Sequence, residues 1–296
     1  GKDPMIVLAD ADLDRAARGA VWTAFMNCGQ SCGSIERAYV ARKVLDAFTA
    51  KVVDLAKRVK VGNPLETGVD MGPMANAGQL KLVEDHIADA RAKGAQIPVG
   101  GKRITALPGY FIEPTVLTDV NHTMKVMMEE TFGPTLPIMP FDTPEEAVAL
   151  ANDSPYGLTA SVWTRSRKQA AWFAERLETG SVTVNDHMYS FVEPGAIWGG
   201  IKQTGMGRSH GPYGLHELVN IKYVSMDFLK RKSQTWWFPY DGGLTNLLEK
   251  TITVYHGAGG SRKLKAALGL RRELPRILKT SSVLNYVKSL PRIFKG

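Results

Sequence analysis

The sequence predicts an α/β fold in which helices cover both faces of a mostly parallel sheet, followed by a basic, partly helical C-terminal extension. Short β-rich runs alternate with segments of helical periodicity from residue 4 to residue 185. Strands that alternate with helices of this length imply crossover connections, which place the strands parallel and the helices on both faces. From residue 230 onward, basic residues strongly outnumber acidic ones, so this part of the chain forms a separate region.

The predicted strands are short runs rich in β-branched, aliphatic or aromatic residues: residues 5–8, 38–41, 96–99, 137–141, 159–164 and 181–185. The predicted helices repeat apolar residues with helical spacing: residues 12–25, 44–58, 76–93, 143–152 and 167–177. The fourth helix has the clearest start, because Thr143 and Glu146 form a capping box with Pro144 at the first helical position. A glycine-rich loop follows from residue 185 to residue 213, and residues 218–228 form a further β-rich run.

The composition is that of a soluble globular chain, with 44% hydrophobic and 22% charged residues among 296. No apolar run approaches the roughly 18 residues that span a bilayer, and the first residues lack the pattern of a signal peptide. We therefore expect a cytoplasmic protein. The net charge of +8 is uneven, because residues 230–296 hold 14 Lys or Arg against three acidic residues.

Two cysteines, Cys28 and Cys32, are the candidates for a reactive thiol. No cluster of His or Cys residues offers the further ligands of a zinc site, so we expect no metal centre. Cys32 lies between Gly29 and Gly33, where a predicted helix gives way to a loop, and glycine lets the backbone approach a ligand closely. A thiolate there could attack an electrophilic carbon while its own backbone N–H stabilises the oxyanion. Local spacing alone leaves a small buried core residue as the alternative for Cys32, and Cys28 reads as a spectator.

Five stretches of the chain, in the same order, resemble motifs of the aldehyde dehydrogenase superfamily. Phe-Met-Asn-Cys-Gly-Gln-Ser-Cys at residues 25–32 resembles the cysteine signature F-x-x-x-G-Q-x-C. The other four are Gly-Lys-Asp-Pro at 1–4 (the end of E-L-G-G-K), Glu-Glu-Thr-Phe-Gly-Pro at 129–134 (E-E-x-F-G-P), the stretch 152–158 (N-x-x-x-Y-G-L), and Trp-Gly-Gly-Ile-Lys with Gly-Met-Gly-Arg at 198–208 (F/W-G-G-x-K-x-S-G-x-G-R). Residues 1–228 thus resemble the C-terminal, catalytic-domain half of such an enzyme.

The resemblance implies a three-layer catalytic domain over residues 1–205, a return segment with an oligomerisation strand over 206–229, and a basic amphipathic extension over 230–296. Residues 218–228 match a strand that pairs across subunits, so we expect a homodimer or homotetramer of the intact enzyme. In the superfamily, the general-base glutamate, an asparagine of the oxyanion hole and most of the dinucleotide-binding domain precede the position of Gly1. We therefore expect the chain as given to be an incomplete enzyme.

The resemblance also implies NAD(P)-dependent oxidation of an aldehyde to a carboxylic acid. Cys32 would attack the aldehyde to give a thiohemiacetal, loss of a hydride to NAD or NADP would leave a thioester, and an activated water would hydrolyse it. Glu130 matches the glutamate that binds the nicotinamide ribose, Phe132 would pack beside the nicotinamide, and Trp198 matches an aromatic wall of the aldehyde pocket. The aromatic wall favours a hydrophobic medium- or long-chain aldehyde. The choice between NAD and NADP depends on residues that precede the chain.

Two positions depart from the superfamily pattern in the stretch around Trp198. Ile197 stands where a proline is usual, and Thr204 stands where a serine is usual. Both leave the shape of the pocket open. We expect Lys202 and Arg208 to be structural residues that hold the glycine-rich loop in place.

The basic extension favours binding to an anionic membrane surface. Trp236 and Trp237 follow a run of three cations, and residues 262–270 and 282–294 combine basic residues with apolar faces, as in helices that lie in a lipid interface. A solvated tail and a tail that wraps another subunit are the alternatives. No recognition module surrounds the charge, so we expect no nucleic-acid partner.

Three other functions of the whole chain stay open. In a CoA-acylating aldehyde dehydrogenase, a thiol rather than water would resolve the thioester. Cys32 could instead serve a hydrolase or acyltransferase, although the six histidines sit in no recognisable pairing context. The chain could also be a non-catalytic half-enzyme with a membrane-binding tail. Cofactor-dependent aldehyde oxidation that disappears in Cys32→Ala would separate these functions.

Overall fold

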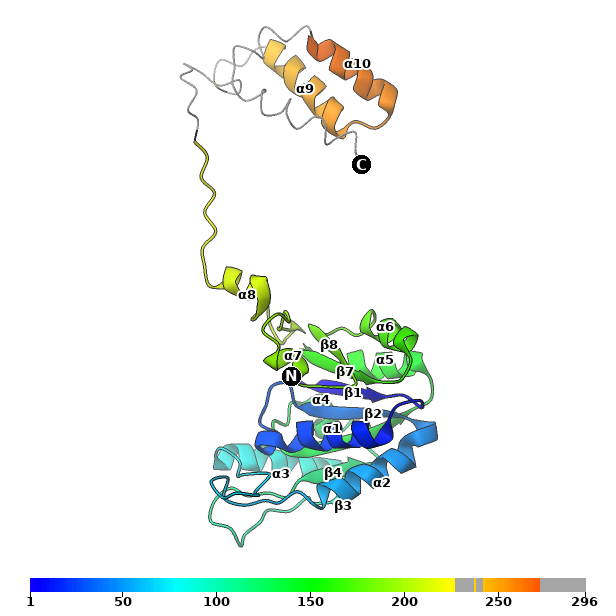
Figure 1. Cartoon of the computed structure of the whole chain (residues 1–296), viewed down its shortest axis with the longest axis vertical. Coiled ribbons are helices and arrows are strands. Elements are labelled where there is room, and N and C mark those ends of the chain that lie inside the picture. The colour runs from blue at the N-terminus through cyan, green and yellow to red at the C-terminus, as the bar shows by residue number, and fades with distance from the viewer. Residues whose placement is uncertain (227–236, 238–241, 272–296) are drawn as a thin grey trace. The chain divides into compact units, whose positions relative to one another are not determined.

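The computed structural model describes residues 1–226, residue 237 and residues 242–271. The chain divides into two compact units, Gly1–Ile221 and Lys222–Gly296. The first unit contains the α/β fold, and the described part of the second contains two helices (Figure 1).

The first unit, all of whose residues are described, is built on a seven-stranded sheet with the order β3-β4-β5-β2-β1-β7-β8. Neighbouring strands run parallel, except that β3 and β4 pair antiparallel. The strands are β1 (Asp3–Val7), β2 (Ile35–Ala41), β3 (Gln96–Val99), β4 (Thr115–Thr118), β5 (Thr135–Phe141), β7 (Thr159–Trp163) and β8 (Ser181–Val184). The predicted α/β class with a mostly parallel sheet is confirmed.

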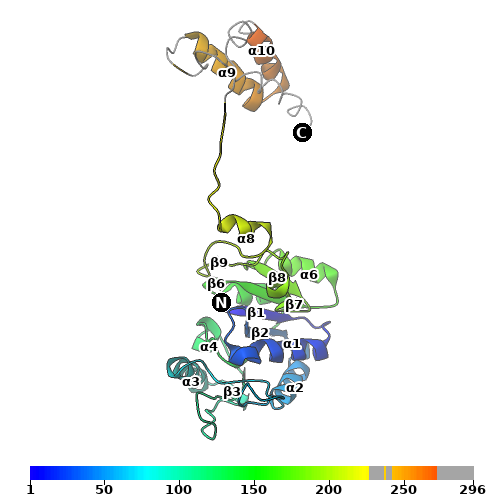
Figure 2. The same ribbon diagram turned by 60° about the vertical axis from the view of Figure 1, so that its left-hand side comes forward.

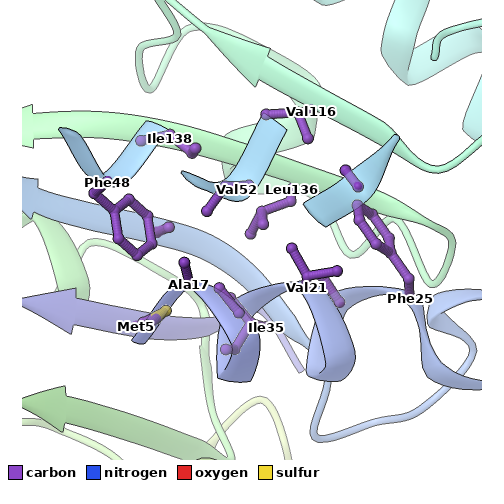
Figure 3. Close-up of a cluster of buried hydrophobic side chains, with 14 of the residues drawn as sticks. Met5, Ala17, Val21, Phe25, Ile35, Phe48, Val52, Val116, Leu136 and Ile138 are labelled. Carbon is purple, nitrogen blue, oxygen red and sulfur yellow. The ribbon is translucent and has the colours of Figure 1, made fainter. Parts of the chain in front are cut away.

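Helices cover both faces of this sheet. Met5 and Val7 belong to one buried cluster with α1 (Leu13–Phe25) and α2 (Leu45–Ala56). Ile6, between them in β1, belongs to a second cluster with α5 (Pro144–Asn152) and α6 (Arg167–Ala174). Successive side chains of a strand point to opposite faces, so this alternation defines three layers. Figure 3 shows the first cluster, in which side chains of both helices meet those of the sheet.

Four helices of this unit begin at polar caps. Asp12, Asn76, Thr143 and Ser166 each accept a hydrogen bond from the backbone N–H three residues ahead. The predicted capping box is present in part: Thr143 caps the Glu146 N–H, but the Glu146 carboxylate accepts from the N–H of the residue before Thr143, at 2.7 Å, in place of that of Thr143. The remaining helices of the first unit are α3 (Ala77–Ala92), α4 (Lys125–Met128), α7 (Tyr189–Val192) and α8 (Gly211–Glu217).

Several parts of the first unit differ from the sequence-based expectation. β4 and the short helix α4 were not predicted. The glycine-rich stretch, expected as a loop, contains α7 and also β9 (Ile201–Lys202), which pairs antiparallel with β6 (Tyr156–Gly157). This small sheet lies beside β7 and β8 (Figure 2), and the Gly180 N–H donates to the Gly157 carbonyl.

Residues 218–226 form neither helix nor strand in this single chain. A strand that pairs across subunits has no partner in one chain, so the oligomerisation strand over 218–228 stays a prediction. Residues 227 and 228 lie outside the described residues.

The described part of the second unit contains α9 (Gly242–His256) and α10 (Gly260–Leu270), which pack side by side. Leu247 and Val254 of α9 are buried. The helical extension is thus confirmed over these residues, whereas Lys230, Trp236 and residues 282–294 lie outside the described residues. None of the helices within the described ranges has the length and apolar character needed to cross a membrane.

Candidate active site

Cys32 lies on a tight turn that leads directly into β2. The Ser34 N–H donates to the Ser31 carbonyl oxygen at 3.0 Å, which closes a turn with Cys32 and Gly33 at its centre. The Cys32 side chain is exposed. The structure therefore places the predicted nucleophile where a substrate can reach it.

The chain between α1 and this turn takes an unusual path. Asn27, Cys28 and Gly29 have successive positive φ angles of 51°, 59° and 69°. This left-handed run brings the backbone of Gly29 against the backbone of Gly133 in the Glu-Glu-Thr-Phe-Gly-Pro stretch. Two of the sequence motifs thus meet through their glycines, because a side chain at Gly29 would separate them.

Gln30 anchors the same segment to the loop before α3. Its side-chain oxygen accepts from the Ala75 N–H at 2.8 Å, and its side-chain nitrogen donates to the Asn27 carbonyl at 3.1 Å. The glutamine of the cysteine signature therefore has a structural role here.

The second thiol is in a different environment. Cys28 is buried, and its Sγ lies 3.4 Å from the Met74 sulfur. Burial raises the pKa of the Cys28 thiol to about 12, so the thiol stays protonated and unreactive at neutral pH. This environment agrees with the prediction that Cys28 is a spectator.

A pocket of about 290 Å³ opens at Cys32. Phe132 and Trp198 line it, so three of the four predicted site residues come together although they lie far apart in the sequence. Met188 and Phe191 complete its apolar wall, and the rings of Phe191 and Trp198 meet edge to face with centroids 5.6 Å apart. The sequence analysis missed both residues. The sign that could have found them is an aromatic run inside an otherwise glycine-rich stretch.

Glu130, the fourth predicted residue, is not among the residues that line this pocket. Its side chain is 32% exposed, and it accepts a hydrogen bond from the amino group of Gly1. It lies two residues before Phe132 in the chain, so the two side chains project from one short segment.

That segment is held by a buried ion pair. Lys2 and Glu36 are both buried, and Lys2 Nζ lies 2.6 Å from a Glu36 carboxylate oxygen. The same carboxylate accepts from the Thr131 N–H at 2.8 Å and from the Phe132 N–H at 2.9 Å. Burial lowers the pKa of Lys2, and the adjacent Glu36 carboxylate works against this shift.

A second buried polar cluster, around His187, contacts the turn that carries Cys32. His187 Nδ1 lies 2.7 Å from Ser161 Oγ. Burial lowers the pKa of His187 to about 3, and a hydrogen bond with the Gly33 backbone opposes that shift. Nearby, Asp3 accepts from the Thr159 hydroxyl at 2.9 Å, and burial raises the pKa of Asp3 to about 7. No histidine is among the described residues that line the pocket.

The wall that carries Trp198 is fixed by backbone hydrogen bonds. Trp198 and Ser209 exchange two hydrogen bonds, of 3.0 and 2.7 Å. Arg208 donates to the Gly200 carbonyl at 2.8 Å, and Lys202 donates to the Asn152 carbonyl at 2.8 Å. These contacts agree with the expected structural roles of Lys202 and Arg208.

Thr204, which stands where a serine is usual, uses its hydroxyl to bind this loop to a neighbouring strand. Its Oγ1 accepts from the Gly157 N–H at 3.0 Å. The hydroxyl at this position therefore joins the loop to β6.

The fold and the pocket define an α/β protein that presents an exposed thiol to an aromatic pocket at the amino end of a central strand. The chain belongs to the aldehyde dehydrogenase family, whose model matches residues 1–224. The motif resemblance is therefore confirmed, and the residues beyond 224 lie outside the match.

Individual relatives agree with this assignment. The chain is 45% identical over 226 residues to a protein of Mycobacterium ulcerans named putative succinate-semialdehyde dehydrogenase (NADP(+)) 2, a match that covers 76% of this chain and 44% of that protein. The crystal structure of succinate-semialdehyde dehydrogenase from Burkholderia pseudomallei superposes with a TM-score of 0.73 at 44% identity, over 76% of this chain and 46% of that one. Betaine aldehyde dehydrogenase from Staphylococcus aureus, in complex with NAD+, superposes with a TM-score of 0.70 at 38% identity, over 73% and 43%. The chain thus spans less than half the length of these relatives.

Proposed function

We propose that this chain is the thiol-bearing part of an NAD(P)-dependent aldehyde dehydrogenase that oxidises an aldehyde to a carboxylic acid. One observation carries the proposal: the exposed thiol of Cys32 shares a pocket with Phe132 and Trp198. The family assignment supports the same chemistry, because an aldehyde oxidation through a thioester needs a nucleophile of this kind.

Cys32 acts as the nucleophile. Its thiolate bonds to the aldehyde carbon, and the carbonyl oxygen becomes the oxyanion of a thiohemiacetal. The Cys32 N–H donates no hydrogen bond within the described residues, so it is free to donate to this oxygen. Loss of a hydride from the substrate carbon then leaves a thioester on Cys32. A water molecule attacks the thioester, gives its proton to a general base, and releases the acid and the thiol.

Glu130 and Phe132 fit the nicotinamide end of a dinucleotide. The Phe132 ring lines the pocket beside Cys32 and offers an apolar surface, and the partly exposed Glu130 carboxylate can accept from ribose hydroxyls. When bound, the cofactor accepts the hydride. NADP(+) in the name of the Mycobacterium ulcerans relative and NAD+ in the Staphylococcus aureus structure support a cofactor of this class.

The pocket favours an apolar aldehyde. Phe132, Met188, Phe191 and Trp198 give it aromatic and thioether surface, and none of the described residues that line it carries a positive charge. A semialdehyde with a second carboxylate would lack a cation here. We therefore expect kcat/KM to be higher for a straight-chain aliphatic aldehyde of similar length than for succinate semialdehyde. The opposite order would contradict this substrate class.

The test of the reaction uses the full-length gene product. Cys32→Ala should abolish NAD(P)-dependent formation of acid from aldehyde, and Cys28→Ala is the matched control that should retain it. A Cys32→Ala enzyme that still oxidises aldehyde would refute the proposal. Product analysis in the presence of coenzyme A separates the acylating alternative, since that enzyme would form an acyl-CoA in place of the acid.

We propose that the intact enzyme is a homo-oligomer joined through residues 218–228. In the described part of this run, Leu218, Ile221 and Tyr223 are 82%, 80% and 88% exposed, which is an aggregation liability for an unpaired strand. Replacing Ile221 and Tyr223 with Asp should shift the enzyme to monomers in sedimentation velocity. Unchanged sedimentation would contradict this interface.

We also propose that the extension over residues 230–296 binds an anionic membrane surface. Residues 260–271 contain four cations and no acid, and Leu264 and Leu268, one turn apart in α10, are 62% and 60% exposed. The chain should sediment with phosphatidylserine-containing vesicles but not with pure phosphatidylcholine vesicles. Leu264→Ser with Leu268→Ser should weaken this binding, whereas Leu65→Ser, at a residue 92% exposed in the first unit, is the matched control. Equal binding of all variants would refute the role of α10.

A further inference from the structure

We propose that Glu36 and Gln79 are positioning residues that clamp the peptide units of Thr131 and Phe132 and so hold the Phe132 ring in the pocket beside Cys32. This inference rests on the proposed function of the pocket. It deepens that function, because it names the residues that set the position of the Phe132 ring, which we propose packs beside the nicotinamide.

The need for a clamp comes from the backbone of Phe132. Its φ is +47°, in the left-handed region that a bulky non-glycine residue rarely adopts. Such a conformation persists only when the surrounding structure determines it. The chain around Phe132 must therefore supply contacts that outweigh the preference of its backbone to relax.

Glu36 holds the donors of this segment. Its two carboxylate oxygens accept from the N–H groups of Thr131 and Phe132, at 2.8 and 2.9 Å. Lys2 pairs with the same carboxylate at 2.6 Å and donates to the Thr131 hydroxyl at 3.1 Å. Because Glu36 lies on β2, this contact fixes the segment to the central sheet.

Gln79 holds the acceptors of the same segment. Its side-chain nitrogen donates to the Thr131 carbonyl at 2.9 Å and to the Phe132 carbonyl at 3.2 Å. Gln79 belongs to α3, whereas Glu36 belongs to β2. Both N–H groups and both carbonyls of the two residues are thus bound by side chains from two separate elements.

The clamp has a consequence for the pocket. Phe132 and Cys32 line the same cavity, so a Phe132 backbone that leaves its positive φ carries the ring out of its present place. The space next to the thiol then becomes larger. Neither Glu36 nor Gln79 lines the pocket, and both contact the backbone of Phe132, so they act on the pocket through Phe132.

The test measures access to Cys32 in the full chain, without aldehyde or cofactor. The readout is the ratio of two alkylation rates, one for the bulky N-phenylmaleimide and one for the small iodoacetamide. Gln79→Ala should raise this ratio at least about threefold, and Phe132→Ala should raise it as much. Gln79 is only half-buried, so its replacement leaves the core intact. Gln96→Ala, which removes the contact of a glutamine in β3 with the Gly94 carbonyl, is the matched control and should leave the ratio unchanged.

A double-mutant cycle decides whether Gln79 acts through Phe132. In the Phe132→Ala background, Gln79→Ala should add no further increase, and Glu36→Gln, if it folds, should behave in the same way. An additive effect of the two substitutions, or a ratio in Gln79→Ala equal to that of the wild type, would overturn the clamp. Since the measurement needs no turnover, it can fail while Cys32→Ala still abolishes oxidation, and the clamp can hold if the proposed oxidation fails.

Discussion

Gly29 and Gly133 are in direct backbone contact: a β-carbon added to Gly29 would lie 2.2 Å from the carbonyl oxygen of Gly133. No rotamer change can relieve this contact, because the obstacle is backbone. The two residues are 104 positions apart, and their contact joins the cysteine segment to the segment that carries Phe132.

Gly29→Ala should therefore be strongly destabilising. It combines an unfavourable φ of +69° with the backbone clash, so we expect a loss of about 3 kcal/mol or more in the free energy of unfolding. Gly68→Ala is the matched control, since Gly68 has a φ of +87° but no atom within 4 Å of an added β-carbon, and should lose only about 1 kcal/mol. Urea unfolding measures both, and equal losses would show that the close contact does not matter in solution.

The two thiols should differ in reactivity at neutral pH. Cys32 is exposed, whereas Cys28 is buried with its pKa raised to about 12 by burial. Brief treatment with iodoacetamide, followed by peptide mass spectrometry, should find the label on Cys32 and leave Cys28 unlabelled until urea unfolds the chain. Comparable labelling of both residues in the folded protein would contradict the structure.

The buried Lys2–Glu36 pair should contribute to stability far more than a surface pair. Glu36→Gln leaves the buried ammonium of Lys2 without its counter-charge, which should cost about 3 kcal/mol or more in the free energy of unfolding. Asp142→Asn breaks the exposed pair with Arg42 and should leave the free energy of unfolding nearly unchanged, because exposed pairs contribute little. Adding Lys2→Met to Glu36→Gln should recover part of the loss in urea unfolding. If it recovered nothing, the unpaired charge would not be the cause.

His187 should contribute a loss of folding stability in mild acid. Its pKa in the folded protein is about 3, below the ordinary 6.5, so between these pH values the unfolded chain binds a proton that the folded chain does not. Folding stability is therefore lost as the pH falls through this window. Asp3 acts in the opposite direction, since its folded pKa of about 7 lets the folded chain take up a proton first.

The variant His187→Gln isolates this effect. Between pH 7 and pH 5, the wild type should lose about 2 kcal/mol more of its unfolding free energy than the variant, because Asp3 contributes equally to both. Urea titrations at the two pH values measure the difference. Identical pH dependence in the two proteins would mean that His187 is protonated alike in the folded and unfolded states.

Much of this arrangement could be predicted from the sequence. Alternating strand and helix periods indicate a parallel sheet with two covered faces, because side chains of period 2 and 3.6 have few ways to bury their apolar surface. Short motifs in a fixed order indicated Cys32, Phe132 and Trp198 as site residues. These motifs are local, so each can be recognised without knowing what it touches.

Only the tertiary structure decides which distant residues meet. The contact of Gly29 with Gly133, the clamp of Glu36 and Gln79 on Phe132, and the place of Phe191 in the pocket all join segments dozens of residues apart. No local period encodes such contacts, because they arise when the crossovers of the sheet bring separate loops to one edge. The sequence by itself determined the fold class and indicated Cys32 as the candidate nucleophile, and the packing of the sheet determined the pocket around it.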